Sequence, residues 1–129
     1  MNAALPSTKD ETAEDAMRTA VAAALDRKAE FLTVLDLSKV SDFTELFLIC
    51  SGTNERQVQA IADHVRHEMR ARGWRPLHVE GERGGKWILL DFGGDMVIHI
   101  FHDETRDFYG LERLWSDAPV VTSKFVEED

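Results

Sequence analysis

Two short, nearly continuous apolar runs, Trp87–Phe92 and Met96–Phe101, dominate the hydrophobic pattern of the chain. The turn-forming residues Gly93, Gly94 and Asp95 separate these runs, which is typical of a β-hairpin. Because consecutive positions are apolar in both runs, the pattern predicts two strands that are covered on both faces and lie inside a sheet.

Two other segments have the apolar spacing of an amphipathic helix. In residues 13–25, alanine and larger apolar residues recur at the i, i+3, i+4 and i+7 positions of one helix face. This alanine-rich face could pack on a sheet or on a second copy of itself, and we favour the sheet. A second helix is expected after Asn54, with Asn54 as its cap, Gln57 reciprocating and Gly73 ending it.

Three further strands are predicted at Phe31–Leu37, Thr44–Ser51 and Trp74–Val79. Pro76 cannot donate to a ladder hydrogen bond, so the last of these strands is placed toward a sheet edge. The middle of the second strand is apolar on both faces, which indicates a position inside the sheet.

A closing helix is expected to begin at Asp103, whose side chain could accept hydrogen bonds from free backbone N–H groups. On this helix Phe108, Leu111 and Trp115 share one face. The complete order, α-β-β-α-β-β-β-α, predicts the α/β (α+β) class with a mixed β-sheet of about five strands flanked by helices.

At 129 residues the chain is predicted to hold one domain, residues 10–118, between a disordered N-terminus (1–9) and a flexible acidic tail (119–129). The formal net charge of −9 disfavours binding to DNA or to an anionic membrane. No basic leader or long apolar run occurs, so we expect a cytoplasmic protein. The only cysteine, Cys50, lies in an apolar run and is interpreted as a buried thiol, not a nucleophile.

Several motifs occur in a specific order: SGTNERQVQAIADHV, PLHVEGE, WILLD, VIHIF and R-x-FYGLERLW. Together they resemble the Iojap family of ribosomal silencing factors, known as RsfS, over roughly residues 29–118. Three positions depart from the family pattern. Lys86 stands where an acidic residue is common, the hairpin turn has one extra glycine, and Leu46 replaces a frequent aromatic residue.

The resemblance implies a nucleotidyltransferase-like fold that lacks the catalytic carboxylates, with no cofactor, no metal and no reaction. It implies binding to large-subunit ribosomal protein fourteen on the large ribosomal subunit. The bound protein would block association with the small subunit and repress translation under nutrient limitation. A homodimer is implied for the free protein.

Trp87 is the residue on which this hypothesis depends. From the residues alone, a core position and an interface position are equally supported, and the resemblance favours the interface. For His99, a hydrogen-bonded core position is the default interpretation. With the resemblance, the predicted partner-binding residues are Trp87, Lys86, Leu89 and Asp91, flanked by Glu80, His99, Arg106 and Tyr109.

Two other kinds of chemistry receive little support from the sequence. Gly52-Thr53 lies between a strand and a helix, but no Asp-x-Asp pair follows it to hold the metal ions of nucleotidyl transfer. His64 and His67 are one helical turn apart, yet further metal ligands cannot be named. A nucleotidyltransferase-type enzyme and a large-subunit assembly factor therefore stay as alternatives to silencing.

Overall fold

The computed structural model describes residues 11–126, apart from the side chains of residues 107–109. Five strands form one mixed sheet in the order β1-β2-β5-β4-β3, in which β2 and β5 are parallel and the other neighbours antiparallel. The predicted mixed sheet of five strands flanked by helices is confirmed. The strands are β1 (Glu30–Asp36), β2 (Leu46–Gly52), β3 (His78–Glu80), β4 (Trp87–Asp91) and β5 (Met96–His102).

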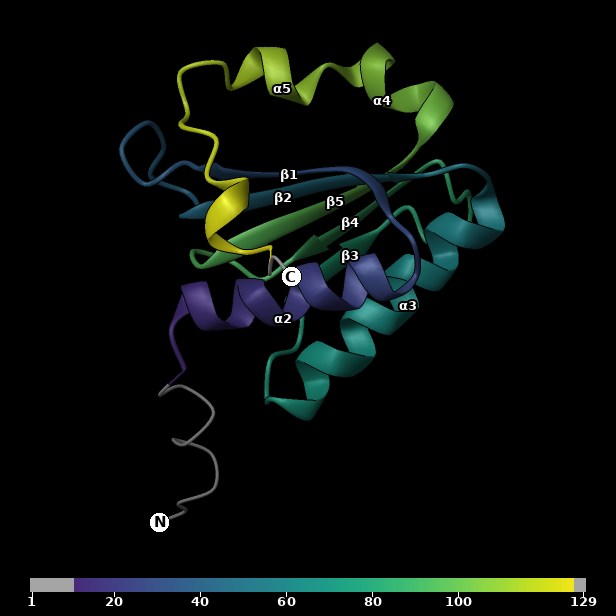
Figure 1. The fold of residues 1–129 in the computed structure, drawn as a ribbon, viewed down its shortest axis with the longest axis horizontal. Helices are drawn as coiled ribbons and strands as arrows, with labels where there is room; N and C mark the ends of the chain where they lie inside the picture. Colours follow the sequence, from purple (N-terminus) through teal and green to yellow (C-terminus); the bar gives the residue numbers. More distant parts are fainter. Residues whose placement is uncertain (1–10, 127–129) are drawn as a thin grey trace.

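Two long helices, α2 (Ala13–Asp26) and α3 (Glu55–Ala71), cover one face of the sheet (Figure 1). Ala16, Ala20 and Ala24 of α2 are completely buried in the core beneath them. Small side chains allow the helix backbone to approach the strands closely, and their burial confirms that the alanine-rich face packs inside this chain.

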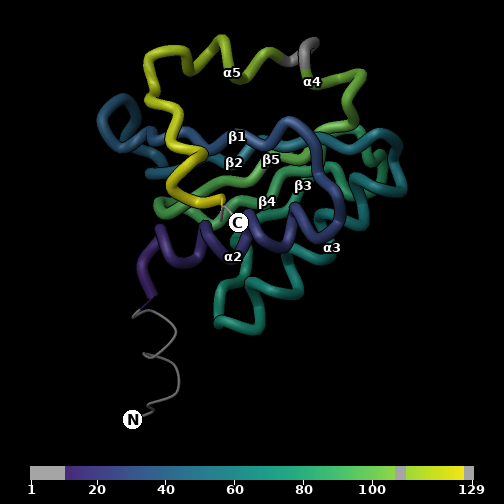
Figure 2. Tube along the Cα trace, viewed as in Figure 1, coloured from purple at the N-terminus to yellow at the C-terminus, as the bar shows by residue number. Residues whose placement is uncertain are grey.

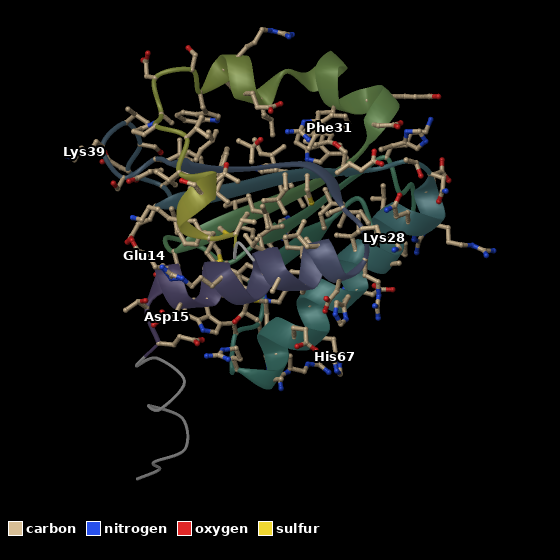
Figure 3. All side chains as sticks on the ribbon, viewed as in Figure 1. Glu14, Asp15, Lys28, Phe31, Lys39 and His67 are labelled. Atoms are coloured by element: carbon tan, nitrogen blue, oxygen red, sulfur yellow. The ribbon has the colours of Figure 1, made fainter. Side chains whose placement is uncertain are left out.

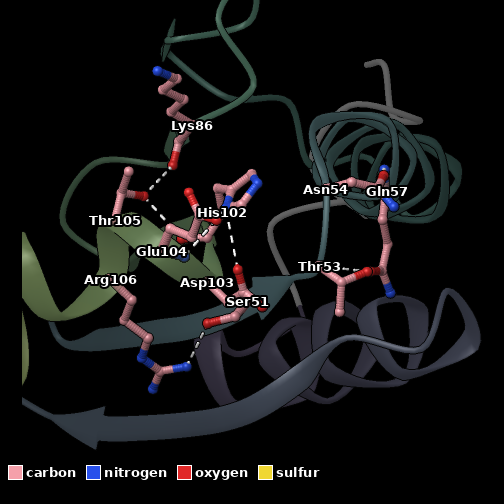
Figure 4. A network of polar contacts seen from close by, with 10 residues as sticks. All are labelled: Ser51, Thr53, Asn54, Gln57, Lys86, His102, Asp103, Glu104, Thr105 and Arg106. Atoms are coloured by element: carbon pink, nitrogen blue, oxygen red, sulfur yellow. Dashed lines mark hydrogen bonds and ion pairs between the residues drawn. The ribbon is translucent and has the colours of Figure 1, made fainter.

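The start of α3 is fixed by the side chains of Asn54 and Gln57. Asn54 Oδ1 accepts a hydrogen bond from the Gln57 N–H at 2.8 Å, as predicted. Gln57 Oε1 accepts from the backbone of Thr53 at 2.7 Å and not from Asn54 (Figure 4). The Gln57 amide also donates to the carbonyls of Arg27 and Lys28, at 3.1 and 2.9 Å. Asn54 therefore caps α3, and the Gln57 side chain closes the turn before α3 and ties it to the end of α2.

The opposite face of the sheet carries two short helices, α4 (Asp103–Tyr109) and α5 (Leu111–Leu114), where one helix was predicted (Figure 2). Gly110 separates them with a φ of 61°, a left-handed conformation that ends the first helix. The expected cap, Asp103, is wrong by one residue. His102 Nδ1 accepts from the N–H of Glu104 at 3.1 Å and caps α4.

The C-terminal segment returns to the exposed edge of β1. The carbonyl of Pro119 accepts from the N–H of Asp36 at 2.9 Å, and the N–H of Val121 donates to the carbonyl of Val34 at 2.8 Å. A single 3-10 turn, η1 (Thr122–Lys124), follows. These hydrogen bonds give the edge strand a partner from within the same chain.

Phe125 anchors this segment, since its side chain is buried in the core that α2 covers. Residues 119–126, which were predicted to belong to a flexible tail, thus lie against β1 and the core in this structure. Acidic composition suggested a solvated tail, but the apolar residues within the segment provide enough burial to fix it. The predicted disordered residues 1–9, and residues 127–129, lie outside the described residues.

Candidate protein-binding surface

β4 has one buried face and one partly open face. Ile88 and Leu90 are fully buried against the side covered by α2 and α3, whereas the alternate residues Trp87, Leu89 and Asp91 are half-buried. The opening exists because α4 packs over β5 and β2. The prediction that both faces are covered is thus confirmed for β5 and wrong for β4.

The edge strand β3 extends this open face. Its register pairs Glu80 with Leu89 and His78 with Asp91, and directly paired residues of neighbouring strands point to the same side of a sheet. Both β3 side chains are exposed, and His78 Nε2 lies 2.5 Å from Glu80 Oε2. We define the β4 surface as Trp87, Leu89, Asp91, His78 and Glu80.

The Trp87 ring is held in place by two residues of the neighbouring strand β5. It stacks on Phe101 with ring centroids 5.0 Å apart, and its Nε1–H donates to His99 Nδ1 at 3.2 Å. Trp87 is therefore half-exposed, with its indole fixed by the strand next to it. An aromatic side chain that is ordered before binding loses little rotamer freedom on binding.

His99 lies behind Trp87, not beside it. Only 4% of its surface is exposed, and burial lowers the pKa of its imidazole to about 3, so the ring is neutral at physiological pH. Because Nδ1 accepts from Trp87, the ring proton is assigned to Nε2, which has no hydrogen-bond partner among residues 11–126. His99 thus supports the Trp87 ring and has almost no surface of its own to offer a partner.

Lys86 and Asp91 lie at the two ends of β4, and both take part in the chain's own hydrogen bonding. The Lys86 carbonyl accepts from the Thr105 hydroxyl at 2.8 Å and from the His102 N–H at 2.9 Å, while its exposed side chain points away from this network (Figure 4). Asp91 Oδ1 accepts from the N–H of Gly93 at 2.7 Å in the hairpin turn.

Arg106 is the predicted residue that the structure places elsewhere. Its side chain is buried; one nitrogen donates to Ser51 Oγ at 2.8 Å, and two others donate to the Glu112 carboxylate at 3.1 and 2.7 Å. Arg106 therefore joins α4 to β2 and α5 and does not belong to the β4 surface. Figure 4 shows its contact with Ser51. The side chain of Tyr109 lies outside the described residues.

One residue of the surface, His78, was not among those predicted. It lies two residues after Pro76, between Leu77 and Val79, and only the pairing of β3 with β4 shows which way it points. The signal in the sequence would have been the alternation His78-Val79-Glu80, in which the apolar residue faces the core.

The structure also tests the other interpretations of the sequence, namely a metal site, a reactive thiol and a membrane-spanning helix. No cluster of three potential metal ligands occurs within the described part of the chain. His64 Nε2 pairs with Asp26 Oδ2 at 3.2 Å. Cys50 is confirmed as a buried thiol, and burial raises its pKa to about 12. Between residues 11 and 126, none of the helices has the length and apolar character needed to cross a bilayer.

The structure is thus a small α+β domain in which a half-exposed tryptophan is fixed on one partly open face of the sheet. The family model described as "Ribosomal silencing factor during starvation" (RsfS) matches residues 10–129. The chain therefore belongs to the RsfS family, which the sequence motifs predicted.

Individual relatives agree with this assignment. The ribosomal silencing factor RsfS of Halalkalibacterium halodurans is 40% identical over 108 residues, covering 84% of this chain and 92% of the relative. A crystal structure of a protein from Chromobacterium violaceum superposes with a TM-score of 0.79 at 30% identity, covering 82% and 88% of the two chains. A mouse protein named "Mitochondrial assembly of ribosomal large subunit protein 1" is 33% identical over 92 residues, which are 68% of this chain and 40% of the mouse protein.

Proposed function

We propose that this protein silences ribosomes in the cytoplasm without catalysing a reaction. It binds the large ribosomal subunit through large-subunit ribosomal protein fourteen, excludes the small subunit by its bulk, and so represses translation under nutrient limitation. Membership of the RsfS family supports the ribosomal role. The observation that carries the proposed contact is the half-exposed Trp87, fixed on the open face of β4.

The β4 surface has the composition of an interface centre. Trp87 and Leu89 supply apolar area, and His78, Glu80 and Asp91 supply a polar rim. A contact of standard size, about 1,600 Å² in total, is enough for stable and specific binding. The net charge of −9 would also accelerate association with a basic ribosomal protein.

Replacing Trp87 by alanine tests this proposal. If Trp87 is an interface anchor, binding to purified large subunits and to isolated ribosomal protein fourteen should weaken by about 2–4 kcal/mol, or roughly 30- to 1,000-fold. Co-sedimentation measures the first interaction, and fluorescence anisotropy of the labelled ribosomal protein measures the second.

Leu114→Ala is the matched control, because Leu114 is a large apolar residue on α5 that is 70% exposed. Its affinity should stay within about twofold of the parent protein. Circular dichroism must show that the Trp87 variant is folded. A folded Trp87→Ala protein that binds as tightly as the control would rule out the β4 surface as the contact.

Large-subunit assembly is the second candidate function, supported by the name of the mouse relative. Both functions use the same partner, but their outcomes differ. Silencing predicts that the added protein lowers the yield of joined ribosomes from mature subunits, measured by light scattering. An assembly factor would leave joining unchanged and would instead cause incomplete large subunits to accumulate when it is depleted.

The proposal includes a homodimer of the free protein. The buried alanine face of α2 is not available for it, but large apolar side chains remain exposed elsewhere, including Phe31 and Phe43. Burial of such residues between two copies would stabilise a dimer. Sedimentation velocity of the free protein measures this directly.

A further inference from the structure

A cavity of about 440 Å³ lies between α3 and the segment that leads into β3. Its walls carry an unusual share of cationic side chains for a chain with a net charge of −9. Figure 3 marks the position of His67, another residue of the groove, on α3. The residues that define this basic groove are Arg66, His67, Arg70, Trp74, Arg75 and His78.

Two of the arginines are not neutralised by any of the residues that the structure describes. Arg66 pairs with Glu82 at 2.6 Å. The side chains of Arg70 and Arg75 are exposed and have no hydrogen-bond or ion-pair partner in the part of the chain that the structure describes. One carboxylate, that of Asp63, lines the same groove, where it accepts from Gln59 at 3.3 Å.

The groove wall is firmly built. Trp74 is 6% exposed, and its Nε1–H donates to Glu11 Oε1 at 2.8 Å, which fixes the ring. Glu11 also accepts from Nε of Arg72 at 2.7 Å. The segment after α3 is therefore held in place, and the two unpaired guanidinium groups project from an ordered support.

The groove and the β4 surface are neighbours, because β3 borders both. His78 and Val79 both line the groove, and the side chains of His78 and Glu80 point to the face of the β4 surface. The two sites lie on opposite faces of the sheet and meet at its β3 edge, so a particle contacted through the β4 surface reaches Arg70 and Arg75 where it extends past that edge.

We propose that the basic groove binds phosphate groups of ribosomal RNA beside the protein contact on the large subunit. This inference rests on the proposed function, because the β4 surface is what brings RNA to the groove. Guanidinium groups match phosphate oxygens with paired hydrogen bonds. Phosphates are the dense anionic groups on such a particle, and the net charge of −9 repels them at long range, so this contact depends on the local guanidinium groups of the groove.

The double variant Arg70→Gln/Arg75→Gln tests this inference, with Arg27→Gln/Lys39→Gln as the control that removes two exposed positive charges elsewhere. Dissociation constants are measured for large subunits and for isolated ribosomal protein fourteen, between 50 and 200 mM KCl. Each lost phosphate contact lowers the slope of log K against log salt by about 1. We expect the groove variant to bind large subunits about 10- to 100-fold more weakly at low salt, with a slope lowered by about 2.

Binding of the groove variant to the isolated ribosomal protein should equal that of the control, because no RNA is present there. Equal weakening for the particle and the isolated protein would show an acidic protein contact and overturn the inference. An unchanged affinity and salt slope would overturn it as well. If Trp87→Ala weakens binding and the groove variant does not, the proposed function stands and only the RNA contact fails. If the parent protein does not bind large subunits at all, both fail.

Discussion

The indole Nε1–H of Trp87 donates to Nδ1 of His99 on the neighbouring strand at 3.2 Å. The two residues are not directly paired in the ladder, since Trp87 pairs with Phe101 and His99 with Leu89. The hydrogen bond therefore runs diagonally between β4 and β5, from Trp87 to the residue paired with Leu89. It links a buried, neutral imidazole to the half-exposed indole of the β4 surface.

Burial of His99 should make stability depend on pH. Its folded pKa of about 3 lies below the ordinary value of about 6.5, so between these values the unfolded chain binds a proton that the folded chain does not. Stability from this group is complete above pH 6.5 and is lost as the pH falls toward 3. The slope should approach about 1.4 kcal/mol per pH unit within that range.

His99→Gln is the comparison for this prediction, since glutamine can accept from Trp87 but does not titrate. Urea denaturation at pH 4, 5, 6 and 7 gives the free energy of unfolding of both proteins. The difference between them should change with pH in the stated direction. Parallel curves would show that His99 does not contribute this dependence.

Removing Arg106 should destabilise the protein, although the residue is charged and near the surface. Arg106→Met keeps the aliphatic stem but leaves the buried Ser51 hydroxyl without its donor, at a cost of about 1–3 kcal/mol. Guanidinium denaturation measures the loss. The exposed Arg56→Met serves as the control, and a double-mutant cycle with Ser51→Ala should show coupling between the two partners.

Gly81→Ala should disturb the start of β4. Gly81 has a φ of 83°, and a Cβ atom there would collide with the Trp87 carbonyl. We expect a loss of stability of more than about 1 kcal/mol together with weaker binding to the large subunit. Gly84→Ala in the same loop meets nothing within 4 Å and should change neither quantity. Thermal melting and co-sedimentation of the pair check this, and equal behaviour of the two variants would contradict it.

Phe125→Ala should release the C-terminal segment. The ring is 4% exposed in the core that α2 covers, so its removal should cost about 3 kcal/mol. Hydrogen exchange at the Val121 N–H, which donates to Val34, should become faster than in the parent protein. Val120→Ala, at a site 68% exposed, is the control. Retained protection in the Phe125 variant would mean that the backbone hydrogen bonds hold the segment without the ring.

The sequence predicted the elements that local pattern determines. Helical spacing placed α2 and α3, and continuous apolar runs identified β2 and β5 as strands covered on both faces. Neighbouring residues were also sufficient to predict that Asn54 caps α3 and that Cys50 is buried. The family motifs, more than any single residue, indicated the RsfS fold.

Features that depend on distant partners could not be predicted in this way. Leu89 is apolar like its neighbours, and only the path of α4 over β2 and β5 leaves it half-exposed. The sequence around Arg106 predicts an exposed cation, and only the fold brings Ser51 of β2 within hydrogen-bond distance of it. The two helices after β5 share one apolar spacing, and the conformation of Gly110 alone divides them.

The pairing of the C-terminal segment with β1 has a consequence for self-association. An uncovered edge strand is a template on which other chains can add strands and aggregate. In this protein one edge of the sheet is occupied by residues 119–122, and the other edge, β3, is only three residues long. Deleting residues 119–129 would expose the β1 backbone, and the shortened protein should lose solubility even where its helices and inner strands still fold.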